Sequence, residues 1–274
     1  MSEQETRIEF AKLLLKNEQA FHQLFSALRK YDSFSLLHNR LFAEDPVFNH
    51  FVVDESVLNN QSATEESLRK IVEELKTASS SLGFRTTVFV EKIWRKFQQF
   101  EKVAIGEGYR ITERMEILSK PLEEKNPLKV EPGVQVSETR DFELWNRLFM
   151  DAFKIPPSWE EELLHKNQEL LEDKAVTLFL GKESESKDAA QGCLLSFVVP
   201  RDLMGIYAVG TDSKWRGRGI ARAMMSFAEE RARQIGCKYM TLQTMSSDGV
   251  SPMYKKMGYA TEFERDILWH PLSG

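Results

Sequence analysis

The chain has 274 residues, of which 42% are hydrophobic and 29% are charged, a composition typical of a soluble globular protein with a sizeable core. Its formal net charge of −5 argues against a nucleic-acid partner, because phosphate backbones attract clustered Lys and Arg. The polar residues 1–10 predict no signal peptide and no apolar run is long enough to cross a membrane, so we expect a cytoplasmic protein with no membrane partner.

The cysteines and histidines predict no metal site. Cys193 lies in an apolar run, and Cys237 follows Gly236 at a predicted helix end, so neither has a metal-like neighbour. The five histidines are scattered singly. We expect both cysteines to be reduced thiols in the core, as in a reducing cytoplasm.

Two segments of the first half resemble segments of the second half. GYRITERMEILSKPL begins at Gly108 and GYATEFERDILWHPL begins at Gly258, with Gly-Tyr, Ile-Leu and Pro-Leu at identical spacing. Upstream, LGFRTTVFV from Leu82 mirrors IGCKYMTLQ from Ile235: a helix end, a glycine, a basic residue and a strand. Because both similarities occur in the same order, we predict an internal duplication with a period of about half the chain.

A charged segment with three prolines, SKPLEEKNPLKVEPGVQV, separates these halves and predicts a linker centred near Asn126. We therefore expect two domains, at residues 1–126 and 127–274. The helix of the first half that begins QSATEESLRKIVEEL has a closed start in this prediction. Ser62 can cap it, Glu65 can complete a capping box, and Glu66 adds negative charge that would repel a phosphate.

The second half alternates strands and helices around what we predict to be a mixed sheet of an α/β fold. After a strand near Val134, the predicted helices cover 141–153 and 158–171, with a break at Pro156 and Pro157. Strands follow at 176–181, 193–199 and 204–211, and the polar residues 181–192 predict an exposed hairpin loop. A helix from Ile220, a strand at 238–245, a short helix from Ser251 and a strand at 260–269 complete the order.

The helix that begins at Ile220 has an unusual start. Arg216, Gly217, Arg218 and Gly219 stand where Ser, Thr, Asp or Asn usually satisfies the free N–H groups of the first turn. Such N–H groups attract anions, glycines permit close approach, and arginines add positive charge, so a phosphate or pyrophosphate is the predicted occupant. The alternative is a solvated helix start. The apolar face of this helix is predicted to consist of Ile220, Met224, Phe227, Ala228 and Ile235.

The glycine loop does not match two common phosphate motifs. No Lys-Ser or Lys-Thr follows the glycines, as a Walker A sequence requires, and the third glycine of a dinucleotide fingerprint is missing. Together with the closed helix start of the first half, this predicts a single anion site of another kind in the second half.

These motifs resemble those of the GCN5-related N-acetyltransferase (GNAT) family. Residues 216–221, RGRGIA, match its R-x-x-G-x-G/A signature, and SPMYKKMGY at 251–259 resembles its Y-x-x-x-G-F/Y element. IYAVGTDSKWRGRGIA resembles its coenzyme-contacting strand and loop. The resemblance covers about residues 134–274 and implies a mixed, mostly antiparallel sheet flanked by helices. It further implies two tandem copies, the first degenerate and without the signature.

The resemblance implies acetyl-CoA as the coenzyme. Its pyrophosphate would contact the backbone of Arg216, Gly217, Arg218, Gly219, Ile220 and Ala221, with charge from Arg216, Arg218 and Arg222. Val209, Gly210 and Thr211 would pair with the pantetheine arm, and an N–H near Val209 would polarise the thioester carbonyl. Ser247 and Ser251 either bind the coenzyme or simply end their elements.

Tyr254 is the predicted general acid, because a phenol with an ordinary pKa of about 10 can donate a proton to a departing thiolate. We expect Ser251 to cap the short helix and Pro252 to lie in its first turn, which places Tyr254 near the helix start. A packing tyrosine is the alternative. The base stays open between Tyr207, a water chain, Asp202 and Glu161, since residues 203–211 carry no carboxylate.

Acceptor contacts are predicted more weakly. Trp159, Glu160, Glu161 and Tyr207 are candidates, although an acidic helix start with one packing tryptophan explains the first three as well. The predicted function is transfer of an acetyl group from acetyl-CoA to a primary amine of a small molecule or peptide, by a monomer. The alternatives are an inactive acetyl-CoA-binding sensor, and a nucleotide-binding protein, which would leave Tyr254 unexplained.

Overall fold

The computed structural model describes residues 3–43, 45–83, 85–122, 133–170 and 172–271. The strands are β1 (Ala27–Lys30), β2 (Phe34–His38), β3 (His50–Val53), β4 (Thr86–Glu91), β5 (Arg110–Pro121), β6 (Val134–Thr139), β7 (Val176–Glu183), β8 (Gly192–Val198), β9 (Leu203–Thr211), β10 (Tyr239–Met245) and β11 (Ala260–His270). The helices are α1 (Glu3–His22), α2 (Glu55–Leu58), α3 (Glu65–Leu82), α4 (Phe97–Gly106), α5 (Phe142–Phe153), α6 (Glu160–Leu170), α7 (Ile220–Gln234) and α8 (Ser251–Lys256). Three 3₁₀ turns are η1 (Pro157–Trp159), η2 (Ser213–Trp215) and η3 (Ser246–Asp248).

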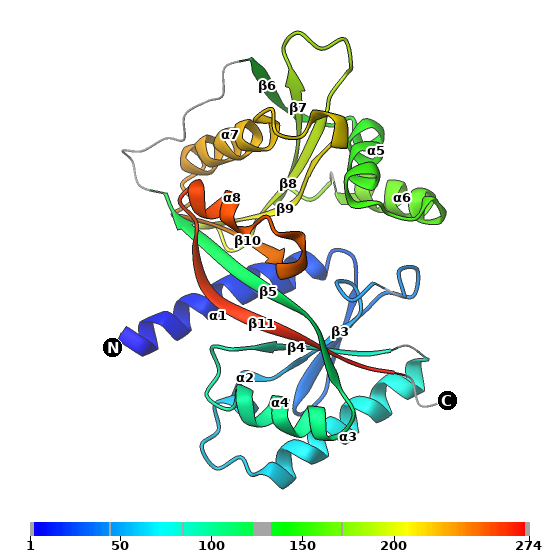
Figure 1. Cartoon of the computed structure of the whole chain (residues 1–274), viewed down its shortest axis with the longest axis vertical. Coiled ribbons are helices and arrows are strands. Elements are labelled where there is room, and N and C mark those ends of the chain that lie inside the picture. The colour runs from blue at the N-terminus through cyan, green and yellow to red at the C-terminus, as the bar shows by residue number, and fades with distance from the viewer. Residues whose placement is uncertain (1–2, 44, 84, 123–132, 171, 272–274) are drawn as a thin grey trace.

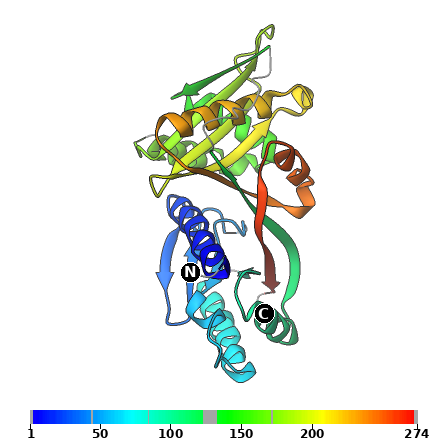
Figure 2. The ribbon, with the colours of Figure 1, turned by 90° about the vertical axis from the view of Figure 1, so that its left-hand side faces the viewer.

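All of these strands join in one sheet, in the order β1-β2-β3-β4-β11-β5-β10-β9-β8-β7-β6 (Figure 1). Neighbouring strands are antiparallel except for β3 beside β4 and β9 beside β10, which are parallel. The predicted mixed, mostly antiparallel sheet with flanking helices is therefore confirmed. The view in Figure 2 shows the sheet twisting strongly between its two ends.

The two long strands at the centre exchange places between the halves of the chain. β5 belongs to the first half but pairs with β10, and β11 belongs to the second half but pairs with β4. β5 and β11 also pair with each other, and Met115 faces Arg265. Met115 and Arg265 are as far apart in the sequence as Gly108 and Gly258. The two similar segments that begin at these glycines therefore form two strands that pair with each other at equivalent positions.

The order of elements also repeats between the halves. Apart from α2, α6 and β6, which have no counterpart, the first half runs α1, β1, β2, β3, α3, β4, α4 and β5, and the second runs α5, β7, β8, β9, α7, β10, α8 and β11. The segment predicted as a linker begins and ends inside strands, since Ser119 belongs to β5 and Val134 to β6. Asn126 and the predicted domain boundary lie outside the described residues.

Helix α1 packs across both halves. Arg7 donates to the carbonyl of Glu262 on β11, at 2.8 Å, and the amide of Asn17 donates to the carbonyl of Val199, after β8, at 2.6 Å. In Figure 1, α1 crosses behind the middle of the sheet. Helix α1, from the first half, is therefore hydrogen-bonded both to the exchanged strand β11 and to the segment after β8.

Most predicted elements of the second half agree with the structure to within one or two residues. Asp141 caps α5 by accepting from the N–H of Leu144 at 3.0 Å, a contact worth about 1 kcal/mol. The second predicted helix begins later than expected, because η1 takes up its first residues. On α7, Ile220, Met224 and Ala228 are buried as predicted.

Two members of the predicted apolar face of α7 were wrong. Phe227 is 39% exposed at the edge of the face, against Phe179, and Ile235 is 37% exposed because α7 ends before it. Both cysteines are buried and free, in agreement with the prediction of core thiols.

Two glycines bring the start of α7 close to the sheet. A Cβ added at Gly181 on β7 would lie 2.9 Å from Ile220, and one added at Gly192 on β8 would lie 2.7 Å from it. Neither strand could carry a side chain there without pushing α7 away. The first turn of α7 is thus held directly above the strands that lead to β9.

Candidate active site

The strands β9 and β10 separate along their length. They pair only between residues 203–205 and 239–241, and beyond these positions the parallel ladder ends. β9 stays paired with β8 on its other side, and β10 with β5. The two strands therefore splay at their C-terminal ends and open a cleft in the sheet.

A bulge in β9 lies at the edge of this cleft. Cys193 on β8 faces Gly210, and Leu195 faces Tyr207, so Ala208 and Val209 together stand opposite Leu194. Ala208 has a φ of 53°, in the left-handed region that residues with a Cβ avoid. Bulges of this kind turn backbone groups away from the ladder, which frees them to contact a ligand.

The start of α7 is open, as the sequence predicted. Gly219 stands at the N-cap with a φ of 83°, and no side chain of the described residues caps the helix. The hydrogen bond that opens α7 runs from the N–H of Ala223 to the carbonyl of Gly219, the N-cap residue, at 2.9 Å. The N–H groups of the residues before Ala223 therefore have no acceptor further back in the helix.

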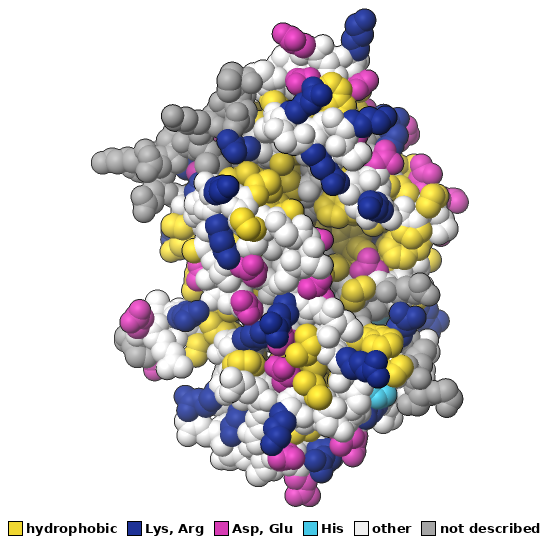
Figure 3. Space-filling view, in the orientation of Figure 1, with side chains coloured by type: hydrophobic (Ala, Val, Ile, Leu, Met, Phe, Trp, Pro, Cys, Tyr) yellow, Lys and Arg dark blue, Asp and Glu magenta, His cyan; other side chains and the backbone are white. Residues whose placement is uncertain are grey.

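A cleft of about 750 Å³ joins the open helix start to the splayed strands. That volume is typical of a small-molecule site. Figure 3 shows the cleft as a hollow with largely apolar walls in the upper half of this face. Of the residues predicted to bind the coenzyme, those lining the cleft are Val209, Gly210, Thr211, Arg216, Gly217, Gly219, Ile220, Ala221, Arg222 and Tyr254.

Tyr254 is almost fully buried on α8 and lines the cleft. Burial, assisted by the negative charge of Asp248, raises the pKa of its hydroxyl to about 12. The phenol therefore keeps its proton at neutral pH and is able to donate it. The predicted cap of α8 was wrong, because Ser251 is the first helical residue and Val250 is the N-cap, whereas Pro252 lies in the first turn as expected.

Three residues predicted as coenzyme contacts do not line the cleft. The guanidinium of Arg218 lies over the ring of Trp215, 4.6 Å from its centroid, and 3.4 Å from a carboxylate oxygen of Glu183. Ser247 lies beside Glu113 and lowers the pKa of that carboxyl. Ser251 is buried beside Tyr254. Their assignment as coenzyme contacts stays a prediction, which for Arg218 covers both its backbone and the charge of its side chain.

The candidates for acceptor contacts are spread more widely. Trp159 packs against Phe42, with 4.9 Å between ring centroids, and Glu160 and Glu161 are exposed at the start of α6. None of these three lines the cleft. Asp202 precedes β9 at the end away from the cleft, so of the base candidates only Tyr207 reaches it.

Tyr207 is poorly suited to act as a base. Its hydroxyl donates to Oδ1 of Asn17 at 2.8 Å, and its ring stacks on Phe21 with 3.6 Å between centroids. Burial, together with the charge of Glu18, raises the pKa of Tyr207 well above its ordinary value. The side chain thus forms a wall of the cleft rather than a proton acceptor.

Several residues of the cleft were missed in the sequence. Gln243 and Thr244 on β10 line it, and the side-chain nitrogen of Gln243 and the hydroxyl of Thr244 are buried without a hydrogen-bond partner. Asp248, Phe153 and Trp215 also line it. The position of Asp248, just before the Y-x-x-x-G-F/Y element, was the one signal available.

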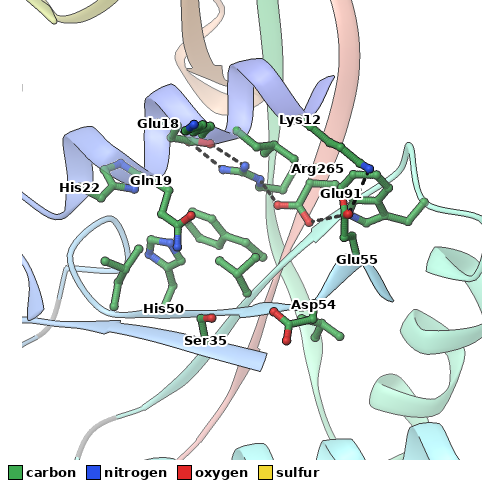
Figure 4. Close-up of a pocket in the computed structure, with 17 residues that line it drawn as sticks. Lys12, Glu18, Gln19, His22, Ser35, His50, Asp54, Glu55, Glu91 and Arg265 are labelled. Carbon is green, nitrogen blue, oxygen red and sulfur yellow. Dashed lines mark hydrogen bonds and ion pairs between the residues drawn. The ribbon is translucent and has the colours of Figure 1, made fainter. Parts of the chain in front are cut away.

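The first half has its own cavity, of about 260 Å³, between α1 and the sheet. Figure 4 shows Glu18, Glu91 and Arg265 pointing toward one another there, from α1, β4 and β11. Arg265 donates to both oxygens of Glu18, at 2.8 and 2.7 Å, and its Nε lies 3.2 Å from Glu91. Each of these charges is nearly or fully buried, so the cluster joins three segments that are remote in the sequence.

Helix α3, the counterpart of α7 in the first half, has a closed start. Thr64 is the N-cap, its side chain accepts from the N–H of Ser67 at 3.2 Å, and the N–H of Thr64 donates to Ser67 Oγ at 3.0 Å. The predicted cap at Ser62 and box at Glu65 were wrong, because a serine rather than a glutamate completes the box. The predicted internal satisfaction of these N–H groups is confirmed.

Among the described residues, no group of three or more His, Cys, Asp and Glu side chains could hold a metal ion. None of the described helices has both the length and the apolar character that a membrane span requires.

Comparison with known proteins places the cleft in a family. Residues 142–259 match the model of the acetyltransferase (GNAT) family. A GCN5-related N-acetyltransferase from Kribbella flavida has a similar structure, with a TM-score of 0.69, 14% identity, and coverage of 96% of this chain and 95% of that chain. Another from Sphaerobacter thermophilus has a TM-score of 0.68, 15% identity, and coverage of 92% and 84%.

A third similar structure is a functionally unknown conserved protein from Staphylococcus epidermidis, with a TM-score of 0.60, 11% identity, and coverage of 90% of this chain and 94% of that chain. No curated protein matches the sequence. At these identities the structures show that the fold extends over both halves of the chain. All residues that line the cleft fall within the matched range. Residues 142–259, which include every residue that lines the cleft, therefore match the acetyltransferase (GNAT) family.

Proposed function

We propose that this protein transfers the acetyl group of acetyl-CoA to a primary amine. The observation that carries the proposal is the cleft that joins an uncapped helix start to a splayed, bulged strand and a buried tyrosine. Its family is one of acetyltransferases, and acetyl-CoA, when bound, supplies an acetyl group activated as a thioester. The residues present fit that coenzyme at three places.

The start of α7 suits a pyrophosphate. Gly217 has a φ of 77°, and a Cβ added there would meet nothing within 4 Å, so the loop is open to solvent. The N–H groups around Gly219 would donate to the phosphate oxygens, and Arg216 and Arg222 line the same end of the cleft. Helix N-termini of this kind bind anions through their N–H groups and the helix dipole.

The bulged part of β9 suits the thioester. Beyond Gly205, β9 has lost its partner β10, so the backbone of Val209, Gly210 and Thr211 is available to the pantetheine arm. The N–H of Val209 would donate to the thioester carbonyl, which stabilises negative charge that develops on that oxygen.

Tyr254 would supply the proton that the departing sulfur requires. Tyr254 lines the cleft, and its hydroxyl holds its proton at neutral pH because burial raises its pKa to about 12. A sensor that only bound the coenzyme would not require this proton donor. The retained tyrosine therefore supports a catalyst over an inactive sensor.

We also infer that the two halves arose by duplication, at a boundary near Asn126, and that one chain is the working unit. The repeated order of elements and the exchange of β5 and β11 support this inference. The first half keeps the fold but has a closed helix start, so we assign coenzyme binding to the second half only. Light scattering should give the mass of one chain.

The proposal is tested by titrating the protein with acetyl-CoA in a calorimeter, and then by following coenzyme A release with a panel of primary amines. We expect one binding site per chain and release that depends on the amine, with the N-acetyl product identified by its mass. Binding without amine-dependent release across the panel would favour the sensor. Absence of binding would overturn the proposal.

A further inference from the structure

Helix α1 of the first half reaches the wall of the cleft through the side chain of Asn17. This side chain is fully buried and hydrogen-bonded to two strands of the second half. Its amide donates to the carbonyls of Val199, at 2.6 Å, and Phe197, at 3.3 Å, at the end of β8. Its Oδ1 accepts from the hydroxyl of Tyr207, on β9, at 2.8 Å. Because the donor and the acceptor of one amide are both used, Asn17 fixes β8 and β9 relative to α1.

The strand β9 leaves room for Asn17 at one glycine. A Cβ added at Gly205 would collide with Oδ1 of Asn17 and lie 2.6 Å from the ring of Tyr207. A strand glycine of this kind marks a close approach by another part of the chain. Gly205 is also the last residue of β9 that pairs with β10. Asn17 therefore contacts β9 at the point where the two strands part and the cleft begins.

A second residue of α1 holds the same tyrosine. The ring of Phe21 stacks on the ring of Tyr207, with 3.6 Å between centroids and 10° between planes. Both rings belong to the apolar cluster between the sheet and helices α1 and α5, whereas Ile206 belongs to the cluster under α7. Tyr207 therefore projects from the face of the sheet opposite to α7, and the first half supplies two of its contacts.

The residue after Tyr207 has a strained backbone. Ala208 has a φ of 53°, and a residue with a Cβ keeps such a conformation only where its surroundings hold it there. On one side of Ala208, Tyr207 is held by α1. On the other side stands Val209, whose N–H is proposed to polarise the thioester carbonyl. The direction of this N–H therefore depends on contacts that come from the first half.

We propose that Asn17 is a positioning residue of the candidate active site, which holds Tyr207 and thereby keeps the bulge of β9 in the shape that acetyl transfer requires. This inference rests on the proposed acetyltransferase activity. It gives the first half, whose own helix start is closed, a part in catalysis. The proposed pyrophosphate contacts lie at the start of α7, on the other face of the sheet, so coenzyme binding should depend on Asn17 much less than the chemical step does.

The test is a double-mutant cycle between Asn17 and Tyr207, with coenzyme A release measured on the amine that the protein uses best. Asn17→Ala should lower kcat by about 10- to 100-fold, because a small displacement of a reacting group has an effect of this size. The calorimetric dissociation constant of acetyl-CoA should stay the same. Tyr207→Phe, which removes the hydroxyl alone, should also lower kcat. Adding Asn17→Ala to Tyr207→Phe should lower kcat no further, because the contact is already lost.

Leu14→Ala is the matched control. Leu14 is buried on the same helix, one turn before Asn17, and does not line the cleft. This variant should lose stability in urea and keep the kcat of the folded protein. In the protein without coenzyme, amide hydrogen exchange over residues 207–211 should be faster in Asn17→Ala and unchanged in Leu14→Ala.

A second variant covers the case in which Asn17→Ala does not fold. Phe21→Leu removes the stacked ring but keeps an apolar side chain, so it should lower kcat and leave acetyl-CoA affinity as it is. An unchanged kcat in the Asn17 and Phe21 variants would overturn the inference and leave the proposed function standing.

Two further results would also overturn the inference. Additive effects in the cycle would show that Asn17 does not act through Tyr207, and an equal loss of kcat in Leu14→Ala would show a general loss of structure. A protein that does not bind acetyl-CoA would refute the proposed function first, and calorimetry on the unaltered chain measures that separately.

Discussion

Helices α3 and α7 occupy equivalent places in the two halves, yet their first turns differ. The side chain of Thr64 accepts from the N–H of Ser67 in the first turn of α3, and Glu65 and Glu66 add negative charge. Gly219 leaves the N–H groups of α7 uncapped, and arginines flank it. The same fold thus supports a closed helix start in one half and an open one in the other, and a few residues at one turn decide which half can bind an anion.

The halves also differ in where they bury charge. The first half buries charge under α1, where Glu18 and Glu91 pair with Arg265 of β11 from the second half, whereas the second half leaves its splayed strands open as a cleft. The buried cluster therefore contributes stability, and the cleft is the candidate site. The following changes test that division, from the largest expected effect to the smallest.

Arg265→Ala should have the largest effect, on stability. It leaves Glu18 and Glu91 buried without their partner, which costs about 3–5 kcal/mol of unfolding free energy. Urea denaturation measures this loss. Arg69→Ala, which removes the partly exposed ion pairs of Arg69 with Glu65 and Glu107, should cost about 1 kcal/mol or less. Equal costs for the two variants would contradict the role given to the buried cluster.

Tyr254→Phe should reduce kcat by about 100-fold and leave acetyl-CoA affinity unchanged, because only the proton donor is removed. In the unaltered protein, the protonated phenol is the active form and its pKa is about 12. The rate should therefore fall from deprotonation of Tyr254 only above about pH 11, a higher pH than the ordinary tyrosine pKa of about 10 suggests. A stopped-flow rate that falls between pH 7 and 10 in the unaltered protein, but not in Tyr254→Phe, would argue against the assignment.

Gly219→Glu should weaken acetyl-CoA binding by about 30-fold, because it places a negative charge at the open helix start and a Cβ at a φ of 83°. Gly219→Ala separates the two causes, since it keeps the strain and omits the charge. We expect the alanine variant to bind several-fold more tightly than the glutamate variant. Calorimetric dissociation constants that are the same in all three proteins would place the anion elsewhere.

Thr64→Ala should have the smallest effect. Loss of the cap of α3 costs about 1 kcal/mol of stability and should leave acetyl-CoA affinity and kcat as they are. Thermal denaturation and the binding titration measure the two quantities in the same sample. A change in affinity with this variant would show that the closed helix start also takes part in binding.

The sequence predicted the elements of the second half well, because each strand and helix there has its own apolar pattern and is bounded by glycine, proline or a cap. It also predicted the open start of α7, which depends on four consecutive residues. The full lining of the cleft could not be predicted in this way. Phe153, Trp215 and Gln243 reach the cleft from three remote segments, and nothing near any one of them indicates the others.

The exchange of β5 and β11 between the halves could be predicted from the sequence only in part. The echo from Gly108 and Gly258 indicated two equivalent segments, but no local pattern states that each will pair with a strand of the other half. The cap at Thr64 was missed for a smaller reason, since a serine three residues into the helix is a less familiar partner in a capping box than a glutamate.

The exchange also sets an order of events during synthesis. β4 has no neighbour on its open side until β11 is made, and β11 is among the last described segments of the chain. The sheet of the first half therefore stays incomplete, with one edge of β4 unpaired, until almost all of the second half has been translated. The two halves therefore reach their final shape together, after β11 has been made.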